Sequence, residues 1–426
     1  MLDSLVDKVR NQNAVISVLG LGRVGLPLAT VFANSGFKVI GVDNNSDRLE
    51  LIKKGECPFY DPQLQENLDA CSSTGNLSTI LNFDKNVQAD IIFITVGTPN
   101  TEKNNVDYSQ LYSALREVCQ INLKDKMIIM RSTMPPKTTD EIIIPFIEFN
   151  SNLKSGIDFA IAVCPERILE GQAIKEIQEL PEIIGGVNEI SNNIAAELFK
   201  KINPQKDLLY LSPSGAELAK LFTNIFRYIS FALSNEFAIW AEKYGLDASE
   251  LIKIANYNYP RSNIPKPGFV GGPCLGKDGS FLDSNTTFSS IVSTAWKLNE
   301  SIPQHIVNNI KNILGPIFNK KITVLGLSFK SGSDDLRDSP SVKLVNILES
   351  AGANVIIHDP YVKTTADLST ALNSPDVVIL ATNHKEFKNL ASAIQQSGCK
   401  IIYDVWGMYD KNDFTDIDYF QFGNGS

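Results

Sequence analysis

Short apolar runs that end at glycine or polar residues recur along the first half of the chain. The run 14–19 ends at Gly20, an apolar helical pattern follows, and the run 37–42 ends at Asp43. This order is typical of a strand, a helix and a second strand that is parallel to the first. The sheet is expected to continue through three similar runs, at 91–96, 127–130 and 159–163.

The second half begins with a long helical pattern and then repeats the strand pattern. Residues 214–244 are apolar-rich with helical spacing, and a shorter helix is expected at 248–256, before a Gly/Pro-rich loop at 265–273. The chain is therefore predicted to be an α/β protein, with two Rossmann-like parallel-sheet domains joined by a central long helix. The expected domains span 1–207, 208–312 and 313–426. The strands expected in the last domain are 322–327, 355–358, 377–380 and 401–403.

Composition and charge narrow the class of protein. The chain has 426 residues with a net charge of -9 and no Lys/Arg-rich run, which argues against nucleic acid as a partner. The N-terminus mixes both charge signs, unlike a signal peptide, and the apolar stretch 222–241 carries Arg227 and Glu236, unlike a membrane span. We therefore expect a cytoplasmic protein without a membrane partner. Scattered cysteines without a C-x-x-C pair fit a reducing compartment and predict no metal site; they are Cys57, Cys71, Cys119, Cys164, Cys274 and Cys399.

A glycine motif follows the first predicted strand. Gly20, Gly22 and Gly25 form a G-x-G-x-x-G pattern between a strand and a helix, the context in which this motif binds the pyrophosphate of a dinucleotide. Asp43 ends the second strand, where a carboxylate accepts hydrogen bonds from the ribose hydroxyls and repels a 2′-phosphate. The pattern therefore favours NAD, with NADP left open because Arg48 is near.

Two further groups of residues could carry chemistry. Cys274 lies in a Gly-rich loop beside Lys277, and a nearby cation raises the reactive thiolate fraction, although a buried cysteine is often only core. Lys220 and Asn224 are four apart on the predicted long helix and so share a face. That face could simply be solvated, but its apolar neighbours indicate burial, where an unpaired lysine is costly.

With these motifs the chain resembles the UDP-glucose/GDP-mannose dehydrogenase family over essentially its whole length. Separate motifs occur in the family's order, and that agreement carries the resemblance. The motifs are the glycine loop, Ser132-Thr133, Cys164-Pro-Glu166-Arg-Ile-Leu-Glu170-Gly, the Lys220/Asn224 pair with the Cys274 loop, Phe329-Lys330, and Asp334-Asp-Leu-Arg337-Asp-Ser-Pro340.

The resemblance implies two successive hydride transfers to NAD from C6 of a nucleotide-linked hexose. Lys220 would assist removal of the hydroxyl proton, and Cys274 would attack the aldehyde to form a thiohemiacetal and then a thioester. Lys220 and Asn224 would stabilise the oxyanion, while Asp278 and Glu166 are candidates for handling the hydrolytic water. Histidine base catalysis is not expected, because all the histidines lie outside these motifs. They are His305, His358 and His384.

The resemblance also implies the binding residues and a homodimer. The first domain would bind NAD, the central domain would form the dimer and active site, and the last would bind the nucleotide sugar. Arg261 would extend into the partner subunit's substrate site. The cofactor contacts would be Gly20, Gly22, Arg23, Val24, Gly25, Asp43, Arg48, Thr98, Thr133, Glu170 and Arg337, with Thr133 near the nicotinamide and also among the catalytic residues. The substrate contacts would be Glu166, Arg167, Ile168, Lys220, Asn224, Arg261, Phe269, Gly271 and Lys330.

The identity of the sugar depends on details that point in two directions. The segment 259–264 and the Cys-Pro-Glu-Arg form at 164–167 resemble the UDP-N-acetylhexosamine branch, which we favour. Lys277 and Asp278 follow the UDP-glucose branch, so a UDP-glucose 6-dehydrogenase is the alternative. Trp406 stands where several relatives carry an arginine that contacts the uridine diphosphate, and an indole cannot replace that charge.

Two other hypotheses for the function are compatible with the sequence. A two-electron hydroxyacid dehydrogenase would also use a glycine loop and a helical Lys with Asn, but it needs neither Cys274 nor a second Rossmann-like domain. A non-catalytic nucleotide-binding protein would keep the fold without turnover. The number of NADH formed per substrate separates these readings: two for the four-electron oxidation, one for the hydroxyacid enzyme, and none for the binding protein.

Overall fold

The chain forms two compact units, each built from one continuous stretch of sequence. The computed structural model describes residues 2–101, 106–273, 275–283 and 290–425. One unit ends at Thr223 and the other begins at Asn224. The boundary therefore falls inside the longest helix, α9 (Pro213–Tyr244).

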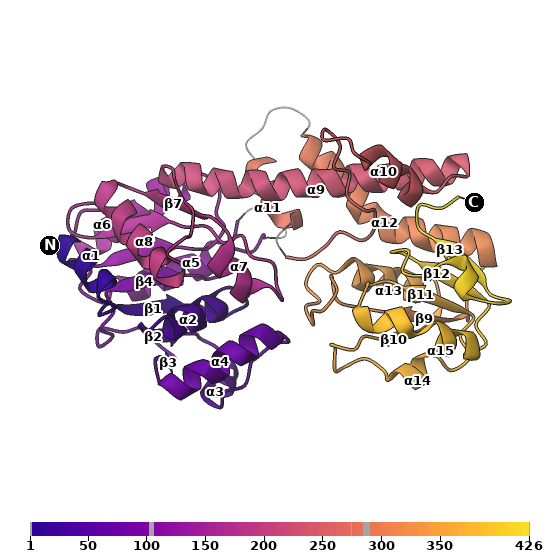
Figure 1. Cartoon of the computed structure of the whole chain (residues 1–426), viewed down its shortest axis with the longest axis horizontal. Helices are drawn as coiled ribbons and strands as arrows, with labels where there is room; N and C mark the ends of the chain where they lie inside the picture. Colours follow the sequence, from indigo (N-terminus) through magenta and orange to yellow (C-terminus); the bar gives the residue numbers. More distant parts are fainter. Residues whose placement is uncertain (1, 102–105, 274, 284–289, 426) are drawn as a thin grey trace. The chain divides into compact units, whose positions relative to one another are not determined.

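The first unit contains an eight-stranded sheet in the order β3-β2-β1-β4-β5-β6-β7-β8. Figure 1 shows β3, β2, β1 and β4 in this order from bottom to top. All neighbours are parallel except β6 and β7, which are antiparallel. The order 3-2-1-4-5 on successive strands is that of a dinucleotide-binding Rossmann fold. The strands are β1 (Val15–Leu19), β2 (Lys38–Val42), β3 (Leu77–Ile80), β4 (Ile91–Ile94), β5 (Met127–Met130), β6 (Ala160–Val163), β7 (Glu182–Gly186) and β8 (Leu208–Tyr210).

Helices cover both faces of this sheet because its central strands are apolar on both sides. Ile91 and Phe93 of β4 belong to one buried cluster, with residues of α1, α2, α4, α7 and α8. Ile92 and Ile94 belong to another, with residues of α5, η1 and the start of α9. Strand alternation thus builds two cores from one strand. The helices are α1 (Leu2–Arg10), α2 (Gly25–Asn34), α3 (Ser46–Lys53), α4 (Pro62–Thr74), α5 (Ser109–Val118), the π-helix η1 (Thr139–Ile143), α6 (Ile144–Ser151), α7 (Ala173–Glu179) and α8 (Glu189–Ile202).

The second unit contains a five-stranded sheet in the order β10-β9-β11-β12-β13, with every pair parallel. Its strands are β9 (Lys321–Leu325), β10 (Asn354–His358), β11 (Val377–Leu380), β12 (Ile401–Asp404) and β13 (Asp418–Gln421). Its helices are the C-terminal part of α9, α10 (Ala248–Asn256), α11 (Leu275–Asp283), α12 (Ile291–Leu314), α13 (Pro340–Ser350), α14 (Leu368–Ala371), the short η2 (Lys385–Asn389), α15 (Ala391–Gln396) and η3 (Lys411–Asp413).

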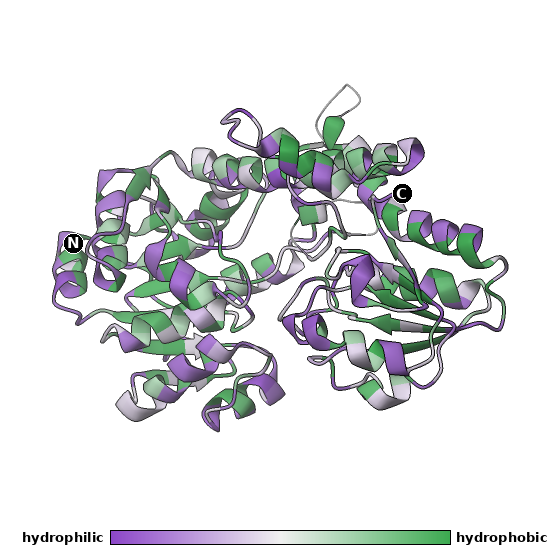
Figure 2. Ribbon diagram, turned by 45° about the vertical axis from the view of Figure 1, so that its right-hand side comes forward, coloured by the Kyte–Doolittle hydropathy of each residue, from purple (hydrophilic) through white to green (hydrophobic). Residues whose placement is uncertain are grey.

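Helices also cover both faces of the second sheet. Val377 and Ile379 of β11 pack in a cluster with residues of α9, α12 and α13. Val378 and Leu380 pack on the opposite side with residues of η2 and α15. In Figure 2 the strands of both sheets are largely green, whereas the helices alternate between green and purple, as amphipathic helices do.

The predicted fold class, two Rossmann-like domains with a central long helix, is confirmed. The helix predicted at 248–256 has the same bounds, and that predicted at 214–244 begins one residue earlier. The strand expected to reach residue 327 ends at Leu325, because Gly326 turns the chain with φ +96°. No helix in the described part of the chain is both long and apolar enough to cross a membrane.

Candidate active site

The glycine loop at the carboxyl end of β1 has the shape that a dinucleotide requires. Gly20 has φ +94° and donates its N–H to the carbonyl of Val42 at 2.8 Å. A Cβ at Gly25 would lie 1.8 Å from the carbonyl oxygen of Gly20, so only glycine allows this close packing. A Cβ at Gly22 would have no atom within 4 Å, which leaves the backbone open to a pyrophosphate at the start of α2, after Val24.

Asp43 fastens this loop to the end of β2. Its Oδ2 accepts the N–H of Leu21 at 2.7 Å, and its Oδ1 accepts the N–H of Asn45 at 2.9 Å. The Arg48 guanidinium donates to Oδ2 at 2.8 Å. The predicted acidic residue therefore stands beside the glycine loop, with Arg48 bound to the carboxylate.

Other predicted cofactor residues meet at the same edge of the first sheet. The Nε of Arg23 lies 3.6 Å from Oε1 of Glu170, and the guanidinium carbon lies 4.7 Å from the centre of the Phe59 ring. The Thr98 hydroxyl donates to the carbonyl of Thr133 at 2.6 Å, which joins the segments after β4 and β5. These residues follow the carboxyl ends of the strands, the edge at which open parallel sheets bind their ligands.

A buried ion network supports the segment after β6. Glu166 accepts the N–H groups of Arg167 and Ile168 at 2.7 and 2.9 Å, so its carboxylate holds this turn. Its other oxygen accepts from Nε of Arg131 at 2.9 Å, and Arg131 also bonds Glu182. Arg131 is buried, which disfavours its charge, but the two carboxylates outweigh this and raise its pKa. The sequence analysis did not identify Arg131, which directly follows β5.

The predicted catalytic residues on α9 are within and just after the first unit. Lys220 is buried in the first unit, and Asn224 is the first residue of the second. The Asn224 amide donates to Oδ2 of the buried Asp278 at 2.6 Å. Lys277 lies 5.2 Å from the centre of the Phe281 ring. The predicted nucleophile, Cys274, lies outside the described residues.

The Gly-rich loop that precedes Cys274 packs against the loop between β9 and α13. The N–H of Gly272 donates to the carbonyl of Asp338 at 3.2 Å. A Cβ at Gly271 would lie 2.4 Å from Cδ of Pro340, and one at Gly272 would lie 2.6 Å from the Phe329 ring. Glycine therefore brings the 269–272 segment next to the loop that carries Lys330. Phe269 is buried in the core of this unit.

Three predicted cationic contacts have defined surroundings in the second unit. The Lys330 ammonium lies 5.8 Å from the centre of the Phe329 ring. Arg337 forms a two-pronged ion pair with Asp335, in which Nε and Nη2 donate at 2.9 and 2.5 Å. The Arg261 guanidinium lies 4.8 Å from the centre of the Tyr259 ring and is exposed to solvent.

Trp406, which stands in place of an expected arginine, has a packing role. Its indole Nε1 donates to the carbonyl of Ala381 at 2.9 Å. A Cβ at Gly268 would lie 2.7 Å from the indole ring, so the loop before Cys274 also rests on Trp406.

A second carboxylate of the Asp43 type was not predicted. Asp359 follows β10 and accepts the N–H groups of Leu327 and Ser328 at 2.7 and 3.0 Å. His384 lies 3.1 Å from it and was set aside because it lies outside the family motifs. The sequence carried a signal for Asp359. In both units a strand ends at a glycine, and an aspartate directly follows a later strand, so the pattern of Gly20 and Asp43 could have been recognised again at Gly326 and Asp359.

These observations define a Rossmann-type oxidoreductase, with a glycine loop after β1 in the first unit and, in the second, the Gly-rich loop that precedes Cys274. Three family models match the chain. The NAD binding domain of the UDP-glucose/GDP-mannose dehydrogenase family matches residues 14–203, the central domain matches 214–302 and the UDP binding domain matches 323–411. The chain belongs to the UDP-glucose/GDP-mannose dehydrogenase family.

Similar proteins agree with this assignment. A UDP-N-acetyl-D-mannosamine dehydrogenase of Pyrococcus horikoshii is 36% identical over 383 residues, which cover 88% of this chain and 90% of that protein. The structure of the UDP-D-ManNAc dehydrogenase from Pyrococcus horikoshii has a TM-score of 0.90 at 33% identity, covering 96% of this chain and 99% of the other. The UDP-N-acetyl-mannosamine dehydrogenase from Staphylococcus aureus has a TM-score of 0.87 at 31% identity, covering 96% and 98%. This chain is an NAD-dependent nucleotide-sugar dehydrogenase.

Proposed function

We propose that the chain oxidises the C6 alcohol of UDP-N-acetyl-D-mannosamine to the uronate. One alcohol, one water and two NAD⁺ give one carboxylate, two NADH and three protons. The names of similar proteins from Pyrococcus horikoshii and Staphylococcus aureus support this sugar, as does the Pro260-Arg261-Ser-Asn263-Ile264 stretch. The observation that carries the reaction type is the 2.6 Å hydrogen bond from Asn224 to Asp278, four residues after Cys274.

The proposed steps use a base, a nucleophile and a water-directing carboxylate. Lys220 accepts the hydroxyl proton as the first hydride leaves C6, and bound NAD supplies the acceptor for each hydride. The Cys274 thiolate then adds to the aldehyde carbon, and Lys220 with Asn224 donates hydrogen bonds to the oxyanion. Loss of the second hydride and the hydroxyl proton gives a thioester. Asp278 orients the water that cleaves it and releases the thiol.

Glu166 belongs to the proposed site in a supporting position. Its carboxylate already accepts hydrogen bonds from Arg131 and from the N–H groups of Arg167 and Ile168. We therefore propose that Asp278 orients the hydrolytic water and that Glu166 holds the segment with the substrate contacts Arg167 and Ile168. Thr133 is proposed beside the nicotinamide and as a catalytic residue.

The binding residues are proposed as follows. The pyrophosphate would bind at the glycine loop and Asp43 would accept hydrogen bonds from the ribose hydroxyls. The remaining cofactor contacts would be Arg23, Val24, Arg48, Thr98, Glu170 and Arg337. The nucleotide sugar would contact Arg167, Ile168, Arg261, Phe269, Gly271 and Lys330. The proposed domains are 1–207 for NAD, 208–312 for the centre and 313–426 for the nucleotide sugar.

We also propose a homodimer formed through α9 and α10. Several large apolar side chains on these helices are exposed in the single chain, among them Phe226 (71%), Trp240 (51%), Tyr244 (75%) and Ile254 (64%). Apolar surface of this extent commonly marks a protein interface. Arg261, on the loop after α10, would enter the partner's site. The cofactor and the nucleotide-linked substrate support a cytoplasmic location.

Counting NADH against limiting sugar tests the reaction and the substrate together. UDP-N-acetylmannosamine, UDP-N-acetylglucosamine and UDP-glucose are each supplied with excess NAD. We expect two NADH per sugar for UDP-N-acetylmannosamine, no product with Cys274→Ala, and wild-type turnover with the control Cys119→Ala. One NADH per sugar would refute the thioester route, and a preference for UDP-glucose would refute the proposed sugar.

Mixing two inactive variants tests the exchange of Arg261. Arg261→Ala and Cys274→Ala are co-expressed with different tags, and the mixed dimer is purified. If Arg261 serves the partner subunit's site, the mixed dimer contains one complete site and regains about half of the wild-type activity. Activity at the level of the separate variants would show that Arg261 serves its own chain or no site.

A further inference from the structure

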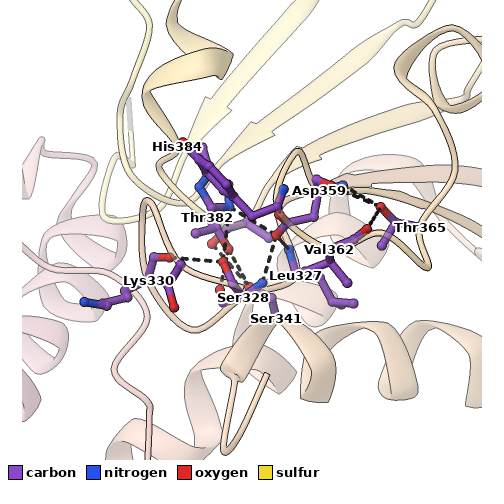
Figure 3. Close-up of polar contacts among 12 residues, drawn as sticks. Leu327, Ser328, Lys330, Ser341, Asp359, Val362, Thr365, Thr382 and His384 are labelled. Atoms are coloured by element: carbon purple, nitrogen blue, oxygen red, sulfur yellow. Dashed lines mark hydrogen bonds and ion pairs between the residues drawn. The ribbon is translucent and has the colours of Figure 1, made fainter. Parts of the chain in front are cut away.

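His384 lies at the centre of a buried polar cluster where the carboxyl ends of β9, β10 and β11 meet (Figure 3). Its side chain is completely buried. Nε2 lies 3.1 Å from Oδ2 of Asp359 and 3.2 Å from the hydroxyl of Ser328. The rings of Tyr361 and Phe387 pack on the imidazole, with centres 4.9 and 5.3 Å away. No step of the proposed reaction uses this histidine.

The hydrogen bonds fix which ring nitrogen carries the proton. The backbone N–H of Gly332 donates to Nδ1 at 3.1 Å, so Nδ1 presents a lone pair. The proton is therefore on Nε2, which faces the Asp359 carboxylate. The ring is neutral, and it bridges a backbone donor on one side to a carboxylate on the other.

The residues that this cluster holds lie on both sides of Lys330. Before it, the N–H groups of Leu327 and Ser328 donate to Asp359, and the Ser328 hydroxyl donates to the carbonyl of Lys330 at 3.0 Å. After it, Gly332 has φ +67° and is held by His384. The Lys330 side chain itself extends away from the cluster (Figure 3). The backbone of Lys330 is thus fixed from inside the unit while its ammonium projects outward.

We propose that His384 is a positioning residue for nucleotide-sugar binding, which acts by accepting the Gly332 N–H and so holding the Lys330 loop in its binding conformation. This inference rests on the proposed function, in which Lys330 contacts the nucleotide sugar. The Gly332 N–H is half-buried, and leaving it without an acceptor costs free energy, so without His384 the loop leaves this conformation to satisfy Gly332. The effect falls on sugar binding, because a loop that must be ordered on binding weakens affinity.

Two substitutions separate the two nitrogens of the ring. His384→Asn places a carbonyl oxygen near the position of Nδ1 and keeps an acceptor for Gly332. His384→Gln places an amide nitrogen near the position of Nε2, keeps a donor for Asp359, and leaves Gly332 without its acceptor. We expect His384→Gln to raise the KM for UDP-N-acetylmannosamine about tenfold, with kcat and the KM for NAD within about twofold of wild type. His384→Asn should restore the sugar KM to within about threefold of wild type.

Lys330→Gln separates this inference from the function on which it rests. UDP-N-acetylmannosamine binding is measured by calorimetry without NAD, so that turnover does not contribute, and thermal melting confirms that each variant is folded. If His384 acts through Lys330, adding His384→Gln to Lys330→Gln produces no further loss of affinity. Equal effects of His384→Asn and His384→Gln, or full additivity with Lys330→Gln, would overturn the inference and leave the proposed function standing. Unchanged affinity in Lys330→Gln would remove the role proposed for Lys330 and the inference with it.

Discussion

In both Rossmann-like units an aspartate holds the turn that follows the first strand of the sheet. Asp43 follows β2 of the first unit, and Asp359 follows β10 of the second. Each accepts the N–H of the leucine after the strand-end glycine, Leu21 or Leu327, at 2.7 Å. The turn geometry therefore comes from the fold and by itself says nothing about which ligand binds.

The two units differ in what else each carboxylate contacts. Asp43 contacts Arg48, whose side chain is 33% exposed, so the surroundings of this carboxylate reach solvent. Asp359 contacts His384, and both side chains are completely buried. The Asp43 side chain is itself only 4% exposed, so the two carboxylates differ in their partners: the side chain of Arg48 reaches solvent, whereas that of His384 does not. In the second unit we propose that Lys330, and not Asp359, contacts the nucleotide sugar.

The largest expected effect is on the stability of the second unit. Asp359→Asn leaves a single carbonyl oxygen for donors that now share a carboxylate, including the N–H groups of Leu327, Ser328 and Tyr361. We expect a loss of about 3 kcal/mol in the free energy of unfolding, measured with urea. Asp43→Asn is the matched variant and should lose about 1 kcal/mol, because solvent reaches its surroundings. Equal losses would contradict the comparison.

Acid should affect the same carboxylate. Burial raises the pKa of Asp359, but the hydrogen bonds from His384 and from the N–H groups of Leu327 and Ser328 outweigh burial and lower the pKa to about 2. A depressed pKa contributes stability above the unfolded value near 3.8, and this stability is lost as pH falls through about 2. In acid denaturation, the difference in the free energy of unfolding between wild type and Asp359→Asn should therefore disappear as the pH falls from about 3.8 to about 2.

A buried carboxyl group in the first unit should respond to pH in the opposite direction. Burial raises the pKa of Glu217 to about 7, although hydrogen bonds from Thr139 partly oppose this. Its favourable contribution is complete below about pH 4.5 and is lost as pH rises through about 7. The loss is on the order of 2 to 3 kcal/mol.

Glu217→Gln keeps an acceptor for Thr139 and cannot ionise. We expect its urea midpoint to change less than that of wild type between pH 5 and pH 8, roughly the range over which Glu217 ionises. The exposed Glu141→Gln is the control and should follow the wild type. Parallel curves for wild type and Glu217→Gln would show that Glu217 does not titrate in this range.

A smaller effect is expected on cofactor affinity, which should depend on Asp43 but not on Asp359. Asp43→Asn removes the negative charge beside the proposed ribose position, so we expect about a tenfold higher KM for NAD and weaker discrimination against NADP. Asp359→Asn, assayed at a temperature where it is folded, should leave the KM for NAD unchanged. A similar rise in both variants would mean that loop distortion, and not contact with the cofactor, causes the effect.

The smallest effect is expected at Arg48. Its ion pair with Asp43 is partly exposed, and such pairs contribute less than about 1 kcal/mol to stability. Arg48→Ala should therefore change the urea midpoint little. A loss comparable to that of Asp359→Asn would show that the two carboxylate sites are alike after all.

The glycine loop of the first unit could be predicted because its characteristic residues lie at the positions where a Rossmann fold requires them. Gly20, Gly22 and Gly25 follow a strand and precede a helix, and Asp43 ends the next strand. The apolar runs of the central strands are buried on both faces, so their continuous hydrophobicity is visible without any structure. The edge strands β3, β8 and β13 are mostly half-buried or exposed and were not predicted, because their sequences carry less apolar signal.

The residues that the sequence missed are those whose partners are distant along the chain. Arg131 contacts Glu166 and Glu182, which are 35 and 51 residues away. His384 contacts Gly332, 52 residues earlier. Neither contact follows from spacing within one helix or strand, so only the folded chain reveals it. The buried strand β7 was not predicted either, so its antiparallel pairing with β6 was also missed.

The continuity of each unit in sequence bears on how the chain folds during synthesis. The eight-stranded sheet is complete once Tyr210 has left the ribosome, and none of its strands comes from the second unit. Once the start of α9, which contributes Ala216 to one of its cores, has also emerged, the first unit can fold while the second is still being translated, since domains generally fold as units from the N-terminus. A translational pause placed within α9 would give this unit time to fold before the second sheet begins to form.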